Sequence, residues 1–292
     1  MRLPAVATNH GGQTDMFDRF LIATDGSDCA RRAAKYGIEL AARYDADVDV
    51  VSVYRGDETQ GQATLDEIAD LAADAGVAVD TELLSGKPAK SIVDYADETG
   101  ADLIVVGRRG RSGVRERLLG SITERVLRRS GPPVLTVAGS EVDADTGTAY
   151  DDILVTTDGS DLAAEAGPYA ADLADRFDAI LHVLNAVDVQ AEAGVFNAGG
   201  VGREYIERLE RKGQRAVDDL IAGIDATNLD VREAVVQGYA PEVIADYVDE
   251  NDVDLVVMSS EGQSNLAGQQ LGTVAGRVLR TVDRPVLVVT ED

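Results

Sequence analysis

Tryptophan is missing from this chain of 292 residues, which also has one cysteine and two histidines. The single Cys29 excludes an intrachain disulfide and a metal site built from cysteines. With only His10 and His182 available, a Ser-His-Asp mechanism or a histidine-bound metal has little to work with. Aromatic residues make up 4% of the chain, so aliphatic side chains must fill most of its core.

No long apolar run is present either. A helix that crosses a membrane needs about 20 mostly apolar residues, and no segment approaches that length. Residues 1–15 contain one arginine and no long apolar stretch, which argues against a signal peptide. Together with the single cysteine, these absences predict a cytoplasmic protein that does not bind a membrane.

Basic residues are scarce: the chain has 27 Lys and Arg against 53 Asp and Glu, a formal net charge of −26. Such an anionic surface is hydrated and is screened by salt. We interpret it as the adaptation of a halophile to a salty cytoplasm; the alternative is an acidic patch for a partner. The same charge argues against nucleic acid as a partner, because a phosphate backbone requires a basic face.

Three segments of the first half return in the second half in the same order. The first is offset by 133 residues and the other two by 152, so the second copy carries about 19 additional residues. Gene duplication explains this ordered repetition. The matched segments are 20–27 with 153–160, 101–106 with 253–258, and 133–137 with 285–289.

The duplication divides the chain into two domains, 17–138 and 150–292. Residues 1–16 match nothing in the second copy and are expected to be a tail. Residues 139–149, rich in Asp, Gly and Thr, are expected to be a linker. Four glycines fall within 190–202, which we expect to be a loop able to cover a ligand site of the second domain.

Each domain alternates apolar runs with helical patterns. This alternation predicts parallel strands covered on both faces, and right-handed crossovers then give an open, doubly wound α/β sheet. The strands expected in the first domain are 19–24, 48–54, 77–83, 102–107 and 133–138, with helices at 28–44, 62–75, 88–99 and 120–130. Those of the second are 152–157, 180–187, 230–236, 254–259 and 285–290, with a long helix at 203–223.

Two glycine-containing segments of the first domain lie where a ligand is expected, because an open parallel sheet binds ligands at the carboxyl ends of its strands. Residues 23–27 follow the first strand, and 107–113 follow the fourth and lead to a helix start at 120–123. Glycine lets main-chain N–H groups approach phosphate oxygens, and a helix N-terminus adds unpaired N–H groups. Ser121 and Thr123 can donate hydroxyls to the same anion.

The spacing of Gly107, Gly110 and the pair Gly120-Ser121 leaves two and nine residues between the glycines. This spacing resembles the G-2x-G-9x-G-S/T signature of ATP-binding universal stress proteins, the UspA-like domains. A bare pair of glycines would be weak evidence. Three glycines at fixed spacing, after the fourth of five strands in a duplicated domain, make the resemblance specific, and it extends over both copies.

The resemblance implies a fold for each domain: a five-stranded parallel sheet of Rossmann-like, adenine nucleotide alpha hydrolase-like type, with strand order 3-2-1-4-5. Single-domain members of the family dimerise, partly by pairing their last strands. The resemblance therefore implies that residues 134–137 and 286–289 pair within this chain, so that the two domains form a pseudo-dimer.

The resemblance also implies a ligand, ATP, with Mg or Mn bound mainly through the phosphates and no metal site made of protein groups alone. The ends of the first two strands would contact adenine. The residue before the first glycine would line the nucleoside, and the loop would hold ribose and phosphates. The implied residues are Ala23, Thr24, Asp25, Val53, Val106, Gly107, Gly110, Gly120, Ser121, Ile122 and Thr123.

Charge around the glycine loop supports an anion site independently. Eight arginines and two glutamates give +6 across 22 residues of an acidic chain. We assign this charge to phosphate binding, because arginine offers phosphate a planar fork of donors; the alternative is a belt of surface ion pairs. The arginines are Arg108, Arg109, Arg111, Arg115, Arg117, Arg125, Arg128 and Arg129.

The second copy departs from the signature. Ser259 replaces the first glycine, Ala275 stands where Thr123 stood, and residues 260–281 carry only +1. A Cβ where ribose packs, or where φ must be positive, costs on the order of 1 kcal/mol, about fivefold in affinity. We expect a weaker second site; the alternative is a site lost altogether. Its residues would be Thr156, Thr157, Asp158, Ala186, Met258, Gly262, Gly272 and Thr273.

These features predict a protein that holds ATP for regulatory or stress-protective purposes. No general base or activated nucleophile is placed near the loop, so we expect no enzyme activity beyond very slow ATP hydrolysis. The alternative is a protein-interaction pseudo-dimer module without functional nucleotide binding. We expect a protein partner of unknown identity. Whether two such chains associate into a homodimer is left open by the sequence.

Overall fold

The computed structural model describes residues 16–54, 56, 58–109, 119–138, 149–189, 203–262 and 271–290. The first domain has β1 (Arg19–Thr24), α1 (Asp28–Tyr44), β2 (Asp47–Tyr54), α2 (Glu58–Asp74), β3 (Asp80–Ser85), α3 (Pro88–Thr99), β4 (Leu103–Gly107), α4 (Ser121–Leu127) and β5 (Val134–Val137). The second has β6 (Asp152–Thr156), α5 (Asp161–Phe177), β7 (Ile180–Val187), α7 (Arg203–Ala222), β8 (Val231–Gln237), α8 (Ala240–Glu250), β9 (Leu255–Ser259), α9 (Thr273–Thr281) and β10 (Val286–Val289).

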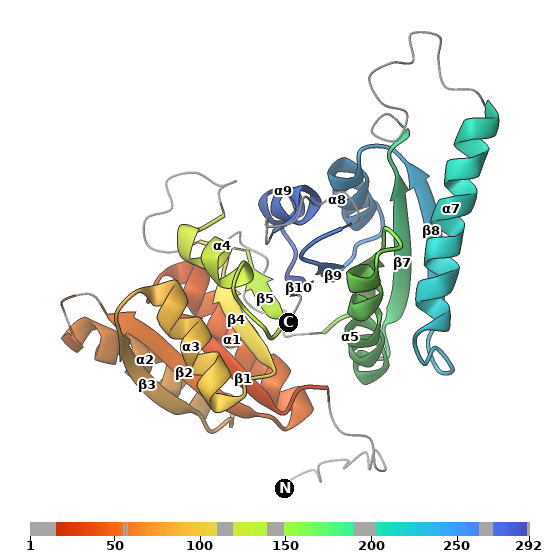
Figure 1. Cartoon of the computed structure of the whole chain (residues 1–292). Coiled ribbons are helices and arrows are strands. Elements are labelled where there is room, and N and C mark those ends of the chain that lie inside the picture. The colour runs from red at the N-terminus through yellow and green to blue at the C-terminus, as the bar shows by residue number, and fades with distance from the viewer. Residues whose placement is uncertain are drawn as a thin grey trace, which may run out of the picture.

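Among the described residues the strands form one continuous sheet, in the order β3-β2-β1-β4-β5-β10-β9-β6-β7-β8 (Figure 1). Each half has the predicted order 3-2-1-4-5 with parallel neighbours. The halves meet at β5 and β10, which pair antiparallel with Leu135 opposite Leu287. The α/β pseudo-dimer is therefore confirmed, and its two five-stranded sheets are joined edge to edge.

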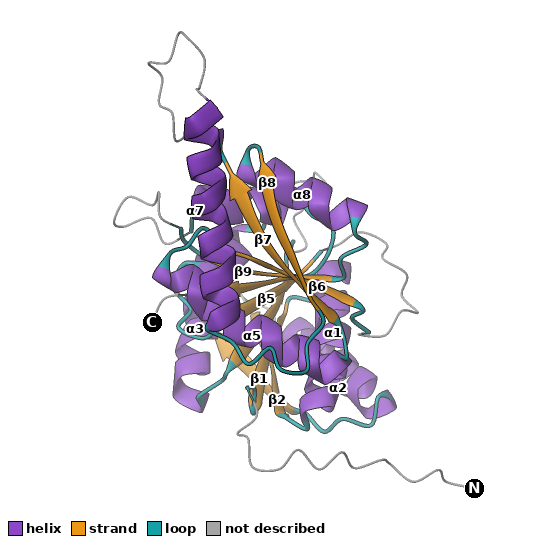
Figure 2. Ribbon diagram, turned by 90° about the vertical axis from the view of Figure 1, so that its right-hand side faces the viewer, coloured by secondary structure: helices purple, strands orange, loops and turns teal. Residues whose placement is uncertain are grey.

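Helices cover both faces of the sheet, and Figure 2 shows the strands running between them. Helices α1, α2, α5 and α7 pack on one face through side chains such as Ile38 and Val217. Helices α3, α4, α8 and α9 pack on the other through side chains such as Ile92 and Val278. Burial on both faces explains why the strands are apolar nearly throughout. No helix in the described part of the chain is long and apolar enough to span a membrane.

The two copies begin and end their first helices in the same way. Ser27 is the N-cap of α1, and its hydroxyl accepts a hydrogen bond from the Ala30 amide at 3.2 Å. Ser160 does the same for α5 with Ala163. Both helices end at an aspartate with a positive φ, Asp45 in the first copy. These caps depend on residues that are close together in the sequence, so the duplicated sequence forms them in both copies.

Element ends differ from the expected ranges where the chain makes contacts that the apolar pattern does not report. β3 begins at Asp80 rather than at 77, because the Val77 amide still closes α2 by bonding the Ala72 carbonyl at 2.9 Å. Helix α2 begins at Glu58, earlier than 62. Helix α4 covers only Ser121–Leu127 of the expected 120–130.

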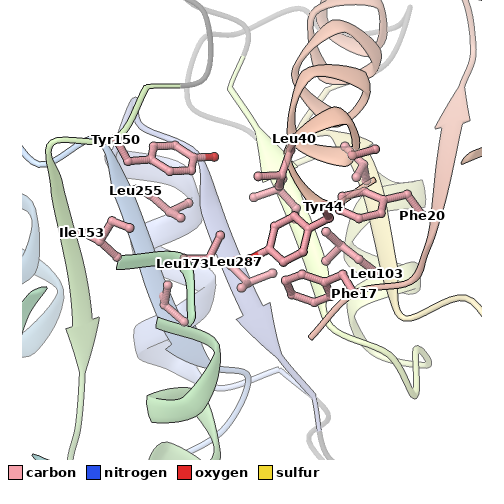
Figure 3. Close-up of a cluster of buried hydrophobic side chains, with 14 of the residues drawn as sticks. Phe17, Phe20, Leu40, Tyr44, Leu103, Tyr150, Ile153, Leu173, Leu255 and Leu287 are labelled. Atoms are coloured by element: carbon pink, nitrogen blue, oxygen red, sulfur yellow. The ribbon is translucent and has the colours of Figure 1, made fainter. Parts of the chain in front are cut away.

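A cluster of aromatic side chains lies where the two domains meet. Phe17 is fully buried and packs edge-on to Tyr44 of α1 at 5.2 Å and stacks with Tyr169 of α5 at 5.7 Å. Figure 3 shows Phe17, Phe20 and Tyr44 pointing toward one another beside Leu287 of β10. Met16, which we expected in the tail, packs partly buried against the same core. The first domain therefore begins one residue earlier than predicted.

Polar contacts reinforce this junction. The Tyr44 hydroxyl hydrogen-bonds a carboxylate oxygen of Asp172 at 2.5 Å, and the Arg176 guanidinium lies 3.9 Å from the centre of the Tyr44 ring. Burial and the neighbouring carboxylate raise the pKa of Tyr44 far above its usual value, so this hydroxyl stays protonated. Both partners of Tyr44 belong to α5, and the tyrosine thus ties α1 to the second domain.

Candidate functional site

A cavity of about 470 Å³ opens at the carboxyl ends of β1, β2 and β4 in the first domain. Helix α2 forms one wall, and the start of α4 forms another. Ten of the eleven residues that the family resemblance implies line it: Ala23, Thr24, Asp25, Val53, Val106, Gly107, Gly120, Ser121, Ile122 and Thr123. The eleventh, Gly110, lies outside the described residues.

Other residues line the same cavity that sequence reasoning missed. Helix α2 contributes Gln60, Gly61 and Thr64, and β2 contributes Ser52 beside Val53. A crossover helix in a parallel sheet begins at the edge where the preceding strand ends. The expected topology could therefore have indicated that the start of α2 lies beside the cavity. The remaining lining residues are Ala30, Val51, Tyr54, Pro88, Ile92 and Arg109.

The turn after β1 is held by its own side chains. The Thr24 hydroxyl accepts a hydrogen bond from the Gly26 amide at 3.2 Å, and Asp25 Oδ1 accepts one from the Ser27 amide at 3.0 Å. Gly26 has φ +74°, and a Cβ on it would lie 2.8 Å from the Thr64 hydroxyl. A glycine is needed here for both reasons. Asp25 thus shapes the turn while lining the cavity.

Gly107 is required by the packing of the fold, independently of any ligand. Its φ is not positive, and a Cβ on it would lie 3.0 Å from main-chain atoms of Cys29 and Ala30, in the first turn of α1. The glycine lets the end of β4 pass this helix closely, and the contact of Gly107 with ribose that the resemblance implies stays a prediction. In the second copy the hydroxyl of Ser259 donates to the Glu261 carbonyl at 2.6 Å.

The helix start at α4 is fixed by two hydrogen bonds. The Gly120 amide donates to the Arg108 carbonyl at 2.7 Å, and the Thr123 hydroxyl donates to the Gly107 carbonyl at 2.8 Å. Thr123 is buried and its hydroxyl hydrogen is used within the loop, so it does not donate to an anion as we predicted. The first amides of a helix have no acceptor within the helix, which leaves those of Ser121 and Ile122 for a ligand.

The arginines of the loop region do not act together. Of the five that the structure describes, only Arg109 lines the cavity. Arg128 pairs with Glu124 on α4 at 2.8 Å, and Arg125 is exposed. Arg108 points away from the cavity into the junction between the domains, so its assignment to the anion site is wrong. Three others, Arg111, Arg115 and Arg117, lie outside the described residues.

Arg108 is 3% exposed and is bonded by oxygens on both sides of the domain junction. Its guanidinium donates to the carbonyls of Val282 and Arg284 in the second domain and to the Thr136 hydroxyl, at 3.1 Å, in the first. Burial lowers the pKa of Arg108 to about 10, although the nearby Asp283 carboxylate opposes this shift. The side chain therefore stays charged at neutral pH.

All eight residues predicted for the second site lie at the corresponding ends of β6, β7 and β9 and at the start of α9. Their surroundings differ from those of the first site. Glu261 stands where Arg109 stands in the first copy. Asn185 replaces Ser52 and donates to the Thr157 carbonyl at 2.7 Å. A Cβ on Gly262 would lie 2.5 Å from the Asp158 carboxylate. One carboxylate, that of Glu261, thus stands in place of the cation of the first site.

A duplicated, doubly wound α/β domain with a cavity at the carboxyl ends of its strands defines a protein with a tandem Rossmann-like fold. The model of the universal stress protein family matches residues 16–138 and 149–290. The chain belongs to this family and carries two copies of its domain.

Relatives cover one copy or both. A universal stress protein of Methanocaldococcus jannaschii is 36% identical over 141 residues, which cover 42% of this chain and 83% of that protein. One of Mycobacterium tuberculosis is 25% identical over 296 residues, 93% of this chain and 96% of that protein. The crystal structure of a universal stress protein from Archaeoglobus fulgidus matches with a TM-score of 0.70 at 20% identity, covering 95% of this chain and 98% of that one. This last likeness shows the same two-domain fold.

Proposed function

We propose that the first domain binds ATP in the cavity at the ends of β1, β2 and β4, and that the protein holds it for a regulatory or stress-protective purpose. One observation carries the proposal: ten of the residues that the family resemblance implies, distant in sequence, line a single cavity. Its volume of about 470 Å³ falls in the range of small-molecule sites, roughly 300–1,000 Å³.

The chemistry of the walls suits the two parts of a nucleotide. Val51, Val53 and Ile92 supply apolar surface for a base. The start of α4 supplies main-chain amides, and Arg109 supplies a positive charge for phosphates. Gly120 has no side chain that would fill the space before these amides. A Mg or Mn ion would bind through the phosphate oxygens, which are the ligands that such hard cations prefer.

The lining residues favour holding the nucleotide over hydrolysing it. In the described part of the cavity there is no His, Cys or Lys side chain to act as a base or nucleophile. Asp25 is the one carboxylate among the lining residues that the structure describes, and its Oδ1 accepts a hydrogen bond from the Ser27 amide. We therefore propose a binding protein whose turnover of ATP is very slow at most.

One ATP per chain is the expected stoichiometry, because the second site has Glu261 in place of Arg109. A carboxylate near the phosphates of ATP would repel them. Calorimetric titration of the full chain with Mg-ATP in molar KCl measures the ratio. A value of two tight sites per chain would contradict the asymmetry while leaving the first site in place.

Binding itself is tested by substitution of one helix-start glycine against its counterpart. Gly120→Val should abolish the ATP-dependent rise in Tm, because a Cβ there would lie 3.0 Å from the Arg108 carbonyl oxygen and would displace the start of α4, which lines the cavity. Gly272→Val is the matched control: a Cβ at either position meets a main-chain oxygen at nearly the same distance, 3.0 Å at Gly120 and 3.1 Å at Gly272. The two substitutions should therefore destabilise the fold by similar amounts, but of these two glycines only Gly120 lines the cavity.

The wild-type chain gives the decisive reference in this experiment. A ligand at 100 times its Kd stabilises a protein by about 2.7 kcal/mol, which is readily seen as a rise in Tm. If millimolar Mg-ATP leaves the wild-type Tm unchanged, the proposed function fails and the pseudo-dimer acts without nucleotide.

A further inference from the structure

In the sequence, Arg108 lies between Gly107 and Arg109, which both line the cavity. The side chain of Arg108, however, extends to the second domain, where it donates to the Val282 carbonyl. Its main chain belongs to the site: the Arg108 carbonyl accepts the Gly120 amide at 2.7 Å, and its amide donates to the Val137 carbonyl at 2.9 Å. One residue therefore touches both the loop of the proposed ATP site and the second domain.

Two of the three acceptors of the guanidinium lie in a short segment of the second domain between α9 and β10. They are the main-chain carbonyls of Val282 and Arg284. A buried cation is costly unless oxygens bond it, so the buried position of Arg108 depends on the second domain being docked. Thr136 joins the two sides, since it accepts from Arg108 and donates to the Val286 carbonyl at 3.2 Å.

The second copy provides an internal comparison. Ser260 occupies the position of Arg108, and its main chain makes the same two bonds, to Val289 at 2.7 Å and from Gly272 at 2.6 Å. The turn therefore forms without an arginine. What the arginine adds in the first copy is a connection from this turn to the other domain, and in the second copy the short Ser260 side chain stands in place of that guanidinium.

We propose that Arg108 is a positioning residue that couples the nucleotide loop of the first domain to the docking of the second, so that ATP binding and the domain contact stabilise each other. The coupling rests on the proposed function for its ligand, but its geometry exists without ligand. By reciprocity, whatever loosens the segment 282–286 weakens ATP binding, and ATP protects that segment.

The test uses the full chain and Arg108→Met, which keeps an apolar stem and removes the guanidinium. The control is Thr290→Val, which removes another hydrogen bond between the domains, from the Thr290 hydroxyl to the Gly131 carbonyl at 2.8 Å. This control bond does not involve the loop. Arg108→Met should weaken ATP binding about tenfold, a typical size for coupling between sites, and Thr290→Val should leave the Kd unchanged.

Amide hydrogen exchange separates the coupling from the ATP proposal. Without ligand, Arg108→Met should speed exchange about fivefold in both 119–124 and 281–286, whereas Thr290→Val should leave 119–124 unchanged. With ATP, the wild type should protect 281–286 and Arg108→Met should not. If Arg108→Met speeds exchange only in 281–286, the arginine stabilises the domain contact without affecting the loop, and the proposed coupling is overturned. If the wild type does not bind ATP, the proposed function falls while the ligand-free exchange still decides the coupling.

Discussion

Arg109→Glu is expected to lower the affinity of the chain for ATP by about a hundredfold or more. Arg109 is the cationic residue among those described in the cavity wall. A hydrogen bond that involves a charged group contributes about 1.5–3 kcal/mol, and the new carboxylate would add repulsion to that loss. A total of about 3 kcal/mol corresponds to a hundredfold change in Kd. Isothermal titration with Mg-ATP at fixed salt measures it.

The matched control for this change is Arg125→Glu. Arg125 lies on α4, close to the loop in sequence, but its side chain is exposed and does not line the cavity. The two variants alter the net charge equally, so any effect of the general field of the protein is common to both. Equal losses of affinity in the two variants would mean that Arg109 makes no local contact with ATP. Raising the salt concentration should reduce the effect of Arg125→Glu more, because exposed charges are screened.

Phe17→Ala should lower the free energy of unfolding by about 3–5 kcal/mol, the range for truncation of a large buried aromatic side chain. Phe17 is fully buried, and its ring contacts Phe20 and Tyr44 of its own domain as well as Tyr169 of the other. The expected loss of stability therefore includes the cost of the cavity and the loss of the three ring contacts. Urea unfolding of the full chain, followed by circular dichroism, gives the value.

Val236→Ala serves as the reference for that measurement. Val236 lies on the edge strand β8 and is 37% exposed, so its truncation should cost well under about 1 kcal/mol. A loss below about 1 kcal/mol for Phe17→Ala as well would show that the aromatic cluster contributes little to the stability of the chain.

The doubly wound sheet and the position of the cavity were predictable because each rests on a signal repeated along the chain, whereas the strand order 3-2-1-4-5 was implied by the family resemblance. Apolar runs separated by helices require a doubly wound sheet, and the carboxyl ends of its strands require the cavity to lie where Thr24 and Gly107 end their strands. The glycine spacing then selects α4 as the second wall. These signals are local in sequence or follow from topology alone.

The direction of individual side chains was not predicted, although one signal for it existed. Successive side chains in extended backbone alternate between two sides. Beyond β4, this alternation separates Arg108 from Gly107 and Arg109, which together line the cavity. A count of arginines treats all of them alike and misses this difference. The role of Thr123 was missed for another reason: its acceptor, the Gly107 carbonyl, lies 16 residues away and is close only in the fold.

The pairing of β5 with β10 has a consequence for how the protein responds to dilution. Because both strands belong to one chain, their association is a first-order process whose effective concentration is set by the connection between the domains. Two separate chains that pair through the same strands fall apart below their dissociation constant, and any property that needs both halves is lost with them. In this chain the halves remain partners at any abundance, from a few copies per cell to many, and they cannot exchange with the halves of other chains without unpairing first.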